Sequence, residues 1–337
     1  MFVAVNLANR IGDASASAQD GAANDSTSDD STVAAPSPLS SAECAFFAKM
    51  NASASAKSLA VPDFAAAGQY AEAGIALLSK TCWEDQYELT LQLYDCAVLS
   101  RFSSHAGRGR GRILRWIDAV AQHARCFNDR FSTHGVWIKL LSMADMEKAI
   151  EESLKVLGQL GAPLDLRGVD TDRVQEELTA MKERFRGERK KKFLEGPRLS
   201  DHNHRRAMKV MSSLIVYYHM QGSCISSYVS CAMIKMSMNH GHCNDSVFAA
   251  AAFASALVNI LSDIEEGSAW ARMTLSLMNL HDREMLIPSI HGSLYGNVLL
   301  WTGKQDALSN WIFLFSTNKN AYTLCIVLPH KSPCNQR

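Results

Sequence analysis

Apolar residues recur at spacings of three and four along much of the chain, most clearly between residues 244 and 282. This spacing predicts a helix that begins at the polar segment 244–246 and ends near Ser262. Ser262 and Glu265 then have the spacing of a capping box, which predicts that a second helix starts at once. The apolar faces predicted for the two helices are Val247, Ala250, Ala254, Leu257 and Leu261, and Ile264, Ala271, Leu275 and Met278.

So short a connection makes the two predicted helices antiparallel neighbours. Small residues at 249–252, Gly267 and Ala271 predict that their backbones approach closely. We expect Ala254 to face Gly267 or Ala271. Glu266 should lie on the solvent side. A seam with small side chains on one helix and large ones on the other is typical of helical repeats.

The same spacing predicts helices elsewhere. They cover a stretch after Pro62, a stretch from Trp83 to Val98, and residues 113–124, 129–142, 145–160, 169–186, 207–221, 224–239 and 287–301. In the pair at 207–239, Val210, Leu214 and Tyr218 are expected to face Tyr228, Ala232 and Met236. Gly161, Gly222 and Gly241 stand where helices end. Apolar character is weak at 51–58, a loop is expected at 103–111, and residues 189–192 are expected to be solvated.

About ten predicted helices and no convincing internal strand indicate an all-α fold. Pairs that repeat every 35 to 40 residues, roughly, are typical of tetratricopeptide-like (TPR-like) arrays, so residues 41–302 are expected to form an α-solenoid of antiparallel helical hairpins. Residues 1–40 are rich in Ala, Ser, Asp, Asn and Pro and predict a disordered leader. In the tail at 303–337, two β-like runs flank a polar turn. Either they form a hairpin packed on the last helix, or the tail is not a natural domain end.

Composition excludes some classes of protein. The 337 residues are 47% hydrophobic and 20% charged, which is enough for a sizeable core, and the formal net charge of zero provides no overall field toward nucleic acid or an anionic membrane. A membrane span is the alternative interpretation of 247–261, but Ser255 and Asn259 interrupt it and a bilayer requires about twenty apolar residues. Nine cysteines without a disulfide-like framework, and no secretory signal at residues 1–10, favour reduced thiols in a cytoplasmic protein.

No motif predicts a catalytic, cofactor-binding or metal-binding site. The glycine-rich run 107–112 lacks the lysine and hydroxyl of a phosphate-binding loop. Metal-ligand residue types at Cys224, Cys231, His240, His242 and Cys243 lack the CxxC and HExxH spacings, and buried thiols with loop histidines are the preferred interpretation. Asp201, His202, His204 and Arg205 could support acid–base chemistry, but exposed polar residues at a helix start explain them better.

Two basic clusters, 108–115 and 184–192, could contact phosphates. They lack interleaved aromatic residues for stacking bases, which disfavours a nucleic-acid partner. Tyrosines and methionines between Met208 and Met238 could line a groove, although such a stripe is more often core. No small-molecule substrate is evident.

With the helices assigned, residues 69–301 resemble the helical-repeat region of large predicted signalling ATPases of the AAA/STAND type, some of them fused to protein or histidine kinases. The similar segments are YAEAGIALL at 70–78, WEDQYELTL at 83–91, EKAIEESLKVLGQLG at 147–161, and 246–277. The resemblance implies a sensing or docking arm whose chemistry lies in other domains. Here the ATPase module that should precede Gln69 is replaced by the leader, and no kinase follows. This implies a stand-alone adaptor or a fragment of a longer gene product.

The sequence therefore favours a non-enzymatic helical-repeat scaffold that binds protein partners, with an ATPase or a kinase as the partner class that the resemblance suggests. The alternative is a regulatory or sensor fragment of an AAA/STAND-type ATPase or ATPase–kinase fusion. An unrecognised all-α enzyme is the third hypothesis.

Overall fold

The computed structural model describes residues 39–104 and 109–278, together with 290, 294 and 298. Over these residues the chain is all-helical, with thirteen helices, no strand, and one isolated β-bridge between Arg198 and His242. The prediction of an all-α fold is confirmed. None of the helices in the described part of the chain has the length and apolar character needed to cross a bilayer. The predicted leader up to residue 38, the predicted tail, residues 105–108 and most of 287–301 lie outside the described residues, although Ile290, Leu294 and Val298 are buried. The loop expected at 103–111 is shorter than predicted, because α5 ends at Ser104 and α6 begins at Arg110.

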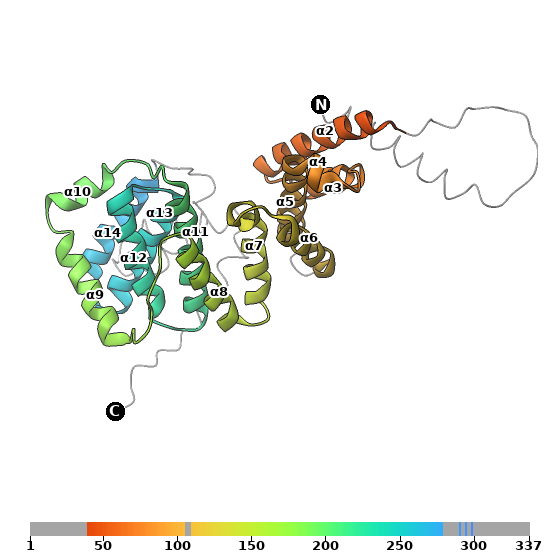
Figure 1. Ribbon diagram of the computed structural model, residues 1–337. Coiled ribbons are helices and arrows are strands. Elements are labelled where there is room, and N and C mark those ends of the chain that lie inside the picture. Colours follow the sequence, from red (N-terminus) through yellow and green to blue (C-terminus); the bar gives the residue numbers. More distant parts are fainter. Residues whose placement is uncertain (1–38, 105–108, 279–289, 291–293, 295–297, 299–337) are drawn as a thin grey trace, which may run out of the picture. The chain divides into compact units, whose positions relative to one another are not determined.

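The contacts divide the chain into two compact units, which meet in sequence between Met143 and Ala144 (Figure 1). The first unit contains α2 (Ser41–Ala60), α3 (Phe64–Ala76), α4 (Cys82–Asp85), α5 (Tyr87–Ser104), α6 (Arg110–His123) and α7 (Phe127–Ser142). The second contains α8 (Met146–Gln159), α9 (Thr171–Arg184), α10 (Glu188–Leu194), α11 (His202–Met220), α12 (Ile225–His240), α13 (Asn244–Asn259) and α14 (Ile264–Met278).

Helix α2 is longer than its apolar pattern suggested. Ser40 and Glu43 form a capping box at its start, and the helix continues through the weak segment 51–58. Its buried face there is small and polar, because Asn51 and Ser55 are fully buried. Ser55 Oγ donates a hydrogen bond of 2.8 Å to the Ala67 carbonyl on α3, and Asn51 Nδ2 donates to the Phe47 carbonyl. Buried polar groups that are satisfied in this way cost little, so a search for apolar periodicity underestimates such a helix.

Glycines bring α2, α3 and α5 close together. A Cβ at Gly74 would lie 2.5 Å from Leu93 Cδ2 and 3.1 Å from Asn51 Cβ, so a larger residue does not fit at this point of α3. At Gly68 a Cβ would lie 3.2 Å from Ser100 Oγ on α5. Because Gly68 and Gly74 have no side chains, α3 packs closely against both α2 and α5.

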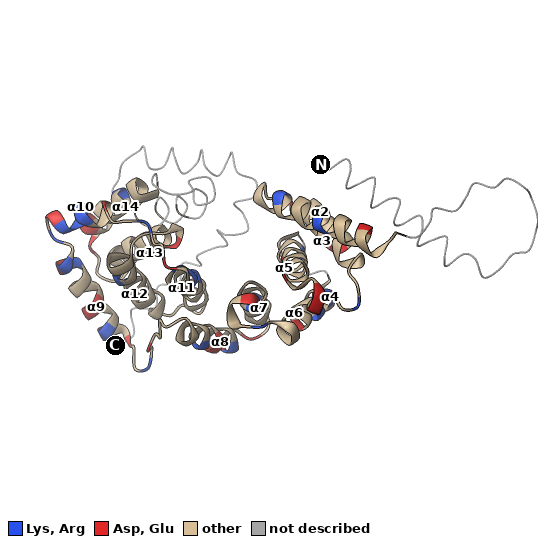
Figure 2. Ribbon diagram, turned by 45° about the horizontal axis from the view of Figure 1, so that its top comes forward, with Lys and Arg blue, Asp and Glu red and all other residues tan. Residues whose placement is uncertain are grey.

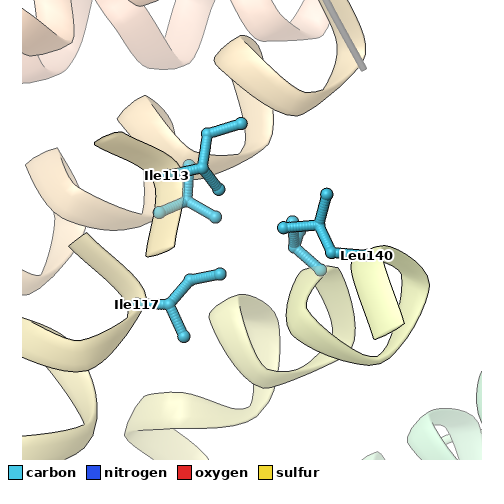
Figure 3. Packing of buried hydrophobic residues seen from close by; sticks show 5 residues of the cluster. Ile113, Ile117 and Leu140 are labelled. Atoms are coloured by element: carbon cyan, nitrogen blue, oxygen red, sulfur yellow. The ribbon is translucent and has the colours of Figure 1, made fainter. Parts of the chain in front are cut away.

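Larger aliphatic side chains form the other core of this unit. Ile113 and Ile117 of α6 pack against Leu140 of α7 (Figure 3), with Val98 of α5 and Val136 of α7 in the same cluster. All five residues have exposed fractions below 7%. Of the residues whose helical spacing predicted α6, Ile113, Ile117 and Val120 are buried, whereas Trp116 and Ala124 are only partly buried.

In the second unit, α9 follows the prediction closely. Val174, Leu178, Met181 and Phe185 are the apolar positions at helical spacing in the predicted segment 169–186, and all four are buried, the last of them directly after α9 ends. Gly161, Gly222 and Gly241 all have positive φ just after helix ends, as their positions predicted. Charged side chains of both signs lie along α9 and α10 in Figure 2, whereas α13 is nearly free of charge.

Arg189, Lys191 and Lys192 are exposed, as predicted for 189–192, and the segment lies within α10, where Lys190 is partly buried and pairs with Glu266 at 2.5 Å. The predicted buried face of α12 is wrong. Tyr228, Ala232 and Met236 are only partly buried, whereas the core side of α12 consists of Ser227, Val229, Ser230, Cys231, Met233, Ile234 and Ser237. The serines there satisfy their hydroxyls locally, as when Ser230 Oγ donates to the Ser227 carbonyl, so polarity does not mark the outer face.

The hairpin of α13 and α14 has the predicted seam. A Cβ at Gly267 would lie 3.1 Å from the Ala254 carbonyl oxygen and 2.5 Å from Val258 Cγ2, which confirms that Ala254 faces Gly267. The cap is one residue later than predicted: Ser262 has a φ of 55° in the connection, and Asp263 Oδ1 accepts the Glu266 N–H at 3.0 Å. Ile264, which the predicted apolar face included, is 43% exposed in the first turn of α14.

Trp270, which the apolar pattern did not select, is fully buried next to Ala271. Its ring contacts those of Phe185 at 4.9 Å, Phe253 at 4.7 Å and Phe193 at 6.0 Å between centroids. These four rings, the Trp270 cluster, come from α9, α10, α13 and α14. Edge-to-face contacts of this kind add to the free energy gained from burial. The Trp270 cluster is therefore a centre at which four helices of the second unit meet.

His242 joins the loop after α12 to the segment after α10. Its ring contacts Phe193 edge-on at 4.5 Å, and its Nε2 donates to the Phe193 carbonyl. The His242 N–H donates to the Pro197 carbonyl at 2.8 Å, and the Leu199 N–H donates to the His242 carbonyl at 2.8 Å. Burial lowers the pKa of His242, which keeps the imidazole neutral in this site.

The glycine seam of the first unit gives a stability prediction. Gly74→Ala should lower the free energy of unfolding by about 1–3 kcal/mol, because the new methyl group overlaps Leu93 and Asn51. Gly135→Ala is the matched control, since a Cβ at this position of α7 meets nothing within 4 Å. It should raise stability by up to about 1 kcal/mol through helix propensity alone. Urea unfolding followed by circular dichroism measures both, and equal effects would contradict the close approach of α3.

The α13–α14 seam gives a second prediction. Ala271 is fully buried, so Ala271→Leu should overpack the seam and cost about 1–3 kcal/mol in thermal or urea melts. Glu266 was expected on the solvent side and to be a silent control, but it is partly buried and pairs with Lys190, so Glu265 replaces it. Glu265→Ala, at an exposed position of the same helix, should leave the melt nearly unchanged. A parent-like Ala271→Leu would show that the seam lies elsewhere.

Candidate functional site

A groove runs between α2 and α5 in the first unit and is the candidate functional site. Its volume is about 430 Å³, and its lining residues are Lys49, Ala52, Ser53, Ala56, Lys57, Ala60, Leu89 and Gln92. Lys49, Ser53 and Lys57 recur at spacings of four, and so do Ala52, Ala56 and Ala60. The six α2 residues therefore form one stripe along the helix. Leu89 and Gln92 form the α5 side. We call this feature the α2–α5 groove.

Small side chains give the groove its shape. Ala52 is 2% exposed and forms part of the floor, whereas Ala56 is partly buried and Ala60 is exposed. Successive residues in a helix rise 1.5 Å, so the floor from Ala52 to Ala60 is about 12 Å long, or two helical turns. The glycine contacts of α3 hold α2 and α5 at this separation, because both helices pack on α3.

The lining residues carry positive charge and no carboxylate. Lys49 and Lys57 are both exposed and are the two basic residues of α2 (blue turns in Figure 2). Glu88 precedes Leu89 but does not line the groove. Phe46 continues the same face of α2 one turn toward the N-terminus and is 59% exposed. The α2–α5 groove is therefore an open channel with a small apolar floor, an exposed aromatic ring beyond one end and two ammonium groups.

A second polar cluster joins α5 to α7. Tyr87 Oη donates a 2.6 Å hydrogen bond to Asp129 Oδ2, and the Arg125 N–H contacts both groups at 3.0 and 3.1 Å. The Arg125 guanidinium lies over the Tyr87 ring, 3.8 Å from its centroid. Trp83 stacks on His123 next to it, with ring centroids 4.8 Å apart. These groups are engaged with one another and serve the packing of this end of the unit.

Asp95 is the unusual member of this region. Its Oδ1 is buried without a hydrogen-bond partner in the described structure. Burial, with the nearby negative charge of Asp129 as the second cause, raises the pKa of Asp95 to about 7. The hydrogen bond from Tyr87 instead lowers the pKa of Asp129. The two carboxyl groups therefore differ in charge near neutral pH, with Asp129 ionised and Asp95 partly protonated.

The residues considered for acid–base chemistry cap a helix. Asp201 is the N-cap of α11 and accepts the His204 N–H at 2.7 Å, and His204 Nδ1 lies 2.8 Å from the same carboxylate oxygen. Arg205 donates to the Leu199 carbonyl, whereas His202 is exposed. The His204 ring stacks on that of His240 at 3.8 Å between centroids. Each of these contacts fixes the start of α11, as expected for polar residues at a helix start.

The histidines and cysteines considered as metal ligands are dispersed. His240 is exposed beside His204, whereas His242 faces Phe193 in the interior. Cys231 is buried, and burial raises the pKa of its thiol well above the usual range. Over the residues that the structure describes, histidine, cysteine and carboxylate side chains form no group of three or more with the arrangement of a metal site.

The basic clusters are partly neutralised by contacts inside their own unit. Arg112 pairs with Glu72 at 2.8 Å, and Arg110 donates to the Leu140 carbonyl at 3.4 Å. In the second cluster, Arg186 pairs with Glu183 and Lys190 with Glu266. Among the methionines between 208 and 238, Met208, Met211 and Met233 belong to the core, whereas Met220 is exposed and the exposed fraction of Met238 is 36%.

Sequence reasoning did not find the α2–α5 groove. The sequence does contain a pattern that could have indicated it, since Ala52, Ala56 and Ala60 recur at spacings of four, with lysines at 49 and 57. Alanine and serine have little weight in a search for apolar stripes, so the segment was judged weak. Asp95 was also missed, because the charge of Asp129, the second cause of its raised pKa, lies on α7, which is distant in sequence.

No family model, curated protein or solved structure matches the chain in the comparisons with known proteins.

Asp95 makes the stability of the first unit depend on pH. A carboxyl group with a folded pKa of about 7 and an unfolded value of 3.8 stabilises the fold most below pH 4, and this contribution is lost as the pH rises through 7. Asp95→Asn removes the charge, so its stability relative to the parent should increase from pH 4 to pH 8, by roughly 1–3 kcal/mol. Urea unfolding at several pH values measures this difference. Asp118→Asn, at an exposed position of α6, should show no such trend. A flat difference for Asp95→Asn would contradict a buried, protonated carboxyl group.

Proposed function

We propose that this chain is a non-enzymatic scaffold for protein–protein interaction and that the α2–α5 groove is a docking site for a helix of a protein partner. The observation that supports this is the groove itself, an open channel with a floor of small side chains between two helices. Small residues let a third helix approach the backbone of α2 closely, as Gly74 and Gly267 do within the fold. Binding of an amphipathic helix in an apolar groove is a common mode of recognition.

A TPR-like array is the architecture that we propose for this scaffold. Neighbouring helices pack on one another in sequence, α2 on α3 and α3 on α5 in the first unit, and α11 on α12, α12 on α13 and α13 on α14 in the second. The α13–α14 pair has a connection of four residues, as helical repeats require. In such arrays each hairpin buries its face against its neighbours and leaves other faces for partners.

The resemblance of residues 69–301 to AAA/STAND-associated repeats is the reason to test an ATPase or a kinase first as the natural partner. A partner of this kind would supply the chemistry, and the chain would supply the docking surface. Six of the residues that line the groove belong to α2, which precedes the segments that carry the resemblance. A test of docking in the groove therefore does not depend on the resemblance.

A direct test uses short alanine–leucine helices labelled with a fluorophore, in three versions with glutamate, glutamine or lysine beside the apolar stripe. At least one version should bind the full chain saturably in fluorescence anisotropy. Ala56→Trp should weaken that binding at least tenfold, roughly, because an indole fills the floor of the groove. Ala65→Trp, at an exposed position of α3 that does not line the groove, is the control and should bind as the parent does. Failure of all three helices to bind would reject the docking function.

A further inference from the structure

We infer that the corner between α9 and α10 is a second docking surface, which binds a short run of aspartate or glutamate residues in a protein partner. The surface consists of Arg184, Arg189, Lys191 and Lys192, and we call it the α9–α10 basic surface. It belongs to the second unit, so the inference does not rest on docking in the α2–α5 groove. It is carried by the density of positive charge, by the exposure of these cations and by the acidic residues around them.

Basic residues are concentrated at this corner. Residues 182–192 hold seven lysine or arginine residues and two glutamates, and Arg186 pairs with one of these glutamates, Glu183, at 2.5 Å. The formal net charge of the whole chain is zero, so the excess of positive charge is local. In both Figure 1 and Figure 2, α10 lies at the edge of the second unit. An acidic segment that approaches this edge is therefore attracted to it.

Ion pairs with α14 hold the corner in place. Lys182 pairs with Asp263, and Lys190 pairs with Glu266, each at 2.5 Å. Phe193 of α10 is buried, which fixes this helix against the core. The α9–α10 basic surface therefore projects from backbone whose position the fold determines, and binding does not have to order that backbone.

The four cations of the surface are exposed, and the described structure does not neutralise them. Arg189 donates a hydrogen bond of 3.4 Å to the Arg184 carbonyl, which leaves both guanidinium charges in place. Lys191 and Lys192 form no ion pair with any residue that the structure describes. All four side chains can therefore turn toward the carboxylates of a partner.

The surroundings of the surface limit the width of the partner. Outside 182–192, residues 144–278 hold ten basic and fifteen acidic residues. Exposed carboxylates occur before and after the run and at the start of α14, at Glu176, Glu195 and Glu265. A broad anionic surface, such as a lipid bilayer or a nucleic-acid duplex, would be repelled by this excess of acidic residues. A short acidic segment can contact the basic surface alone.

The apolar residues of the corner favour the same class of partner. Phe185 and Phe193 are buried, so neither ring can stack on the base of a nucleic acid. Ile264 is 43% exposed and follows Asp263, which pairs with Lys182 beside the basic surface. An aliphatic residue next to the acidic run could cover Ile264. A protein segment can supply both the carboxylates and this aliphatic residue.

Two fluorophore-labelled peptides test the preference for carboxylates. Each has a run of about six glutamates or six glutamines, followed by leucine, among glycine and serine residues. In fluorescence anisotropy at low salt, the glutamate peptide should bind the full chain about tenfold more tightly than the glutamine peptide, because several weak ion pairs form together. Added salt should reduce this advantage. Equal binding of the two peptides, or no saturable binding of either, would overturn the inference.

Charge reversal identifies the binding surface. The double variant Lys191→Glu, Lys192→Glu should weaken binding of the glutamate peptide about tenfold. The control double variant Arg173→Glu, Arg272→Glu makes the same change of net charge at exposed positions of the second unit outside the run, and at moderate salt it should weaken binding less than about threefold. Thermal melts of both double variants establish that the fold is intact. If both weaken binding equally, the peptide responds to net charge and the inference is wrong.

Three other anionic ligands are compared with the glutamate peptide in the same buffer. They are vesicles that contain phosphatidylserine, a duplex RNA, and a synthetic peptide of residues 1–38, which has five aspartates and one arginine. Each should bind the parent more weakly than the glutamate peptide does. The inference is overturned if one of them binds more tightly and the double variant Lys191→Glu, Lys192→Glu abolishes that binding, because the occupant is then a membrane, a nucleic acid or this segment of the chain.

Discussion

Close approach of helix backbones at residues with little or no side chain is the constraint on which both units depend. In the first unit Gly74 leaves room for Leu93 and Asn51, and in the second Gly267 leaves room for Val258 and the Ala254 carbonyl. Helices that approach at such points gain many weak contacts along their length, and a single methyl group at the closest point separates them. The α2–α5 groove is a consequence of the same constraint, because both helices are held by contacts to α3.

The two units add different kinds of packing to these seams. In the second unit a close seam at Gly267 is followed within one turn by Trp270, which fills the space among Phe185, Phe193 and Phe253. In the first unit α2 buries asparagine and serine side chains against α3, and α6 and α7 supply a separate aliphatic cluster. The small face of α2 cannot fill the space beside α5, and the α2–α5 groove is the space that remains.

Ionisable groups in the interior are stabilised in their neutral forms. Burial raises the pKa of Asp95 and lowers that of His242, so each group avoids the cost of a buried charge near neutral pH. Side chains remain charged where an oppositely charged side chain is in contact with them. An example is Lys182 of α9, which pairs at 2.5 Å with Asp263 at the start of α14.

The sequence by itself determined the helical class, most helix positions and several faces. The stripes of α9 and α13 were predicted because large apolar residues recur at helical spacing there, and the glycines at 161, 222 and 241 were found because only a residue without a side chain adopts positive φ at low cost. Ala254 and Gly267 were paired in advance because a short connection leaves few ways for two helices to meet.

Other features depend on contacts between helices, and local sequence patterns could not predict them. Trp270 is buried among the rings of Phe185, Phe193 and Phe253, which other parts of the second unit bring to the same place, whereas Ile264 at the start of α14 is exposed. Serines on α12 and α2 are buried because their hydroxyls find carbonyl acceptors, some of them on other helices. The α2–α5 groove and the pKa of Asp95 have the same origin, since both depend on the separation of helices that are distant in sequence, which only the packed fold sets.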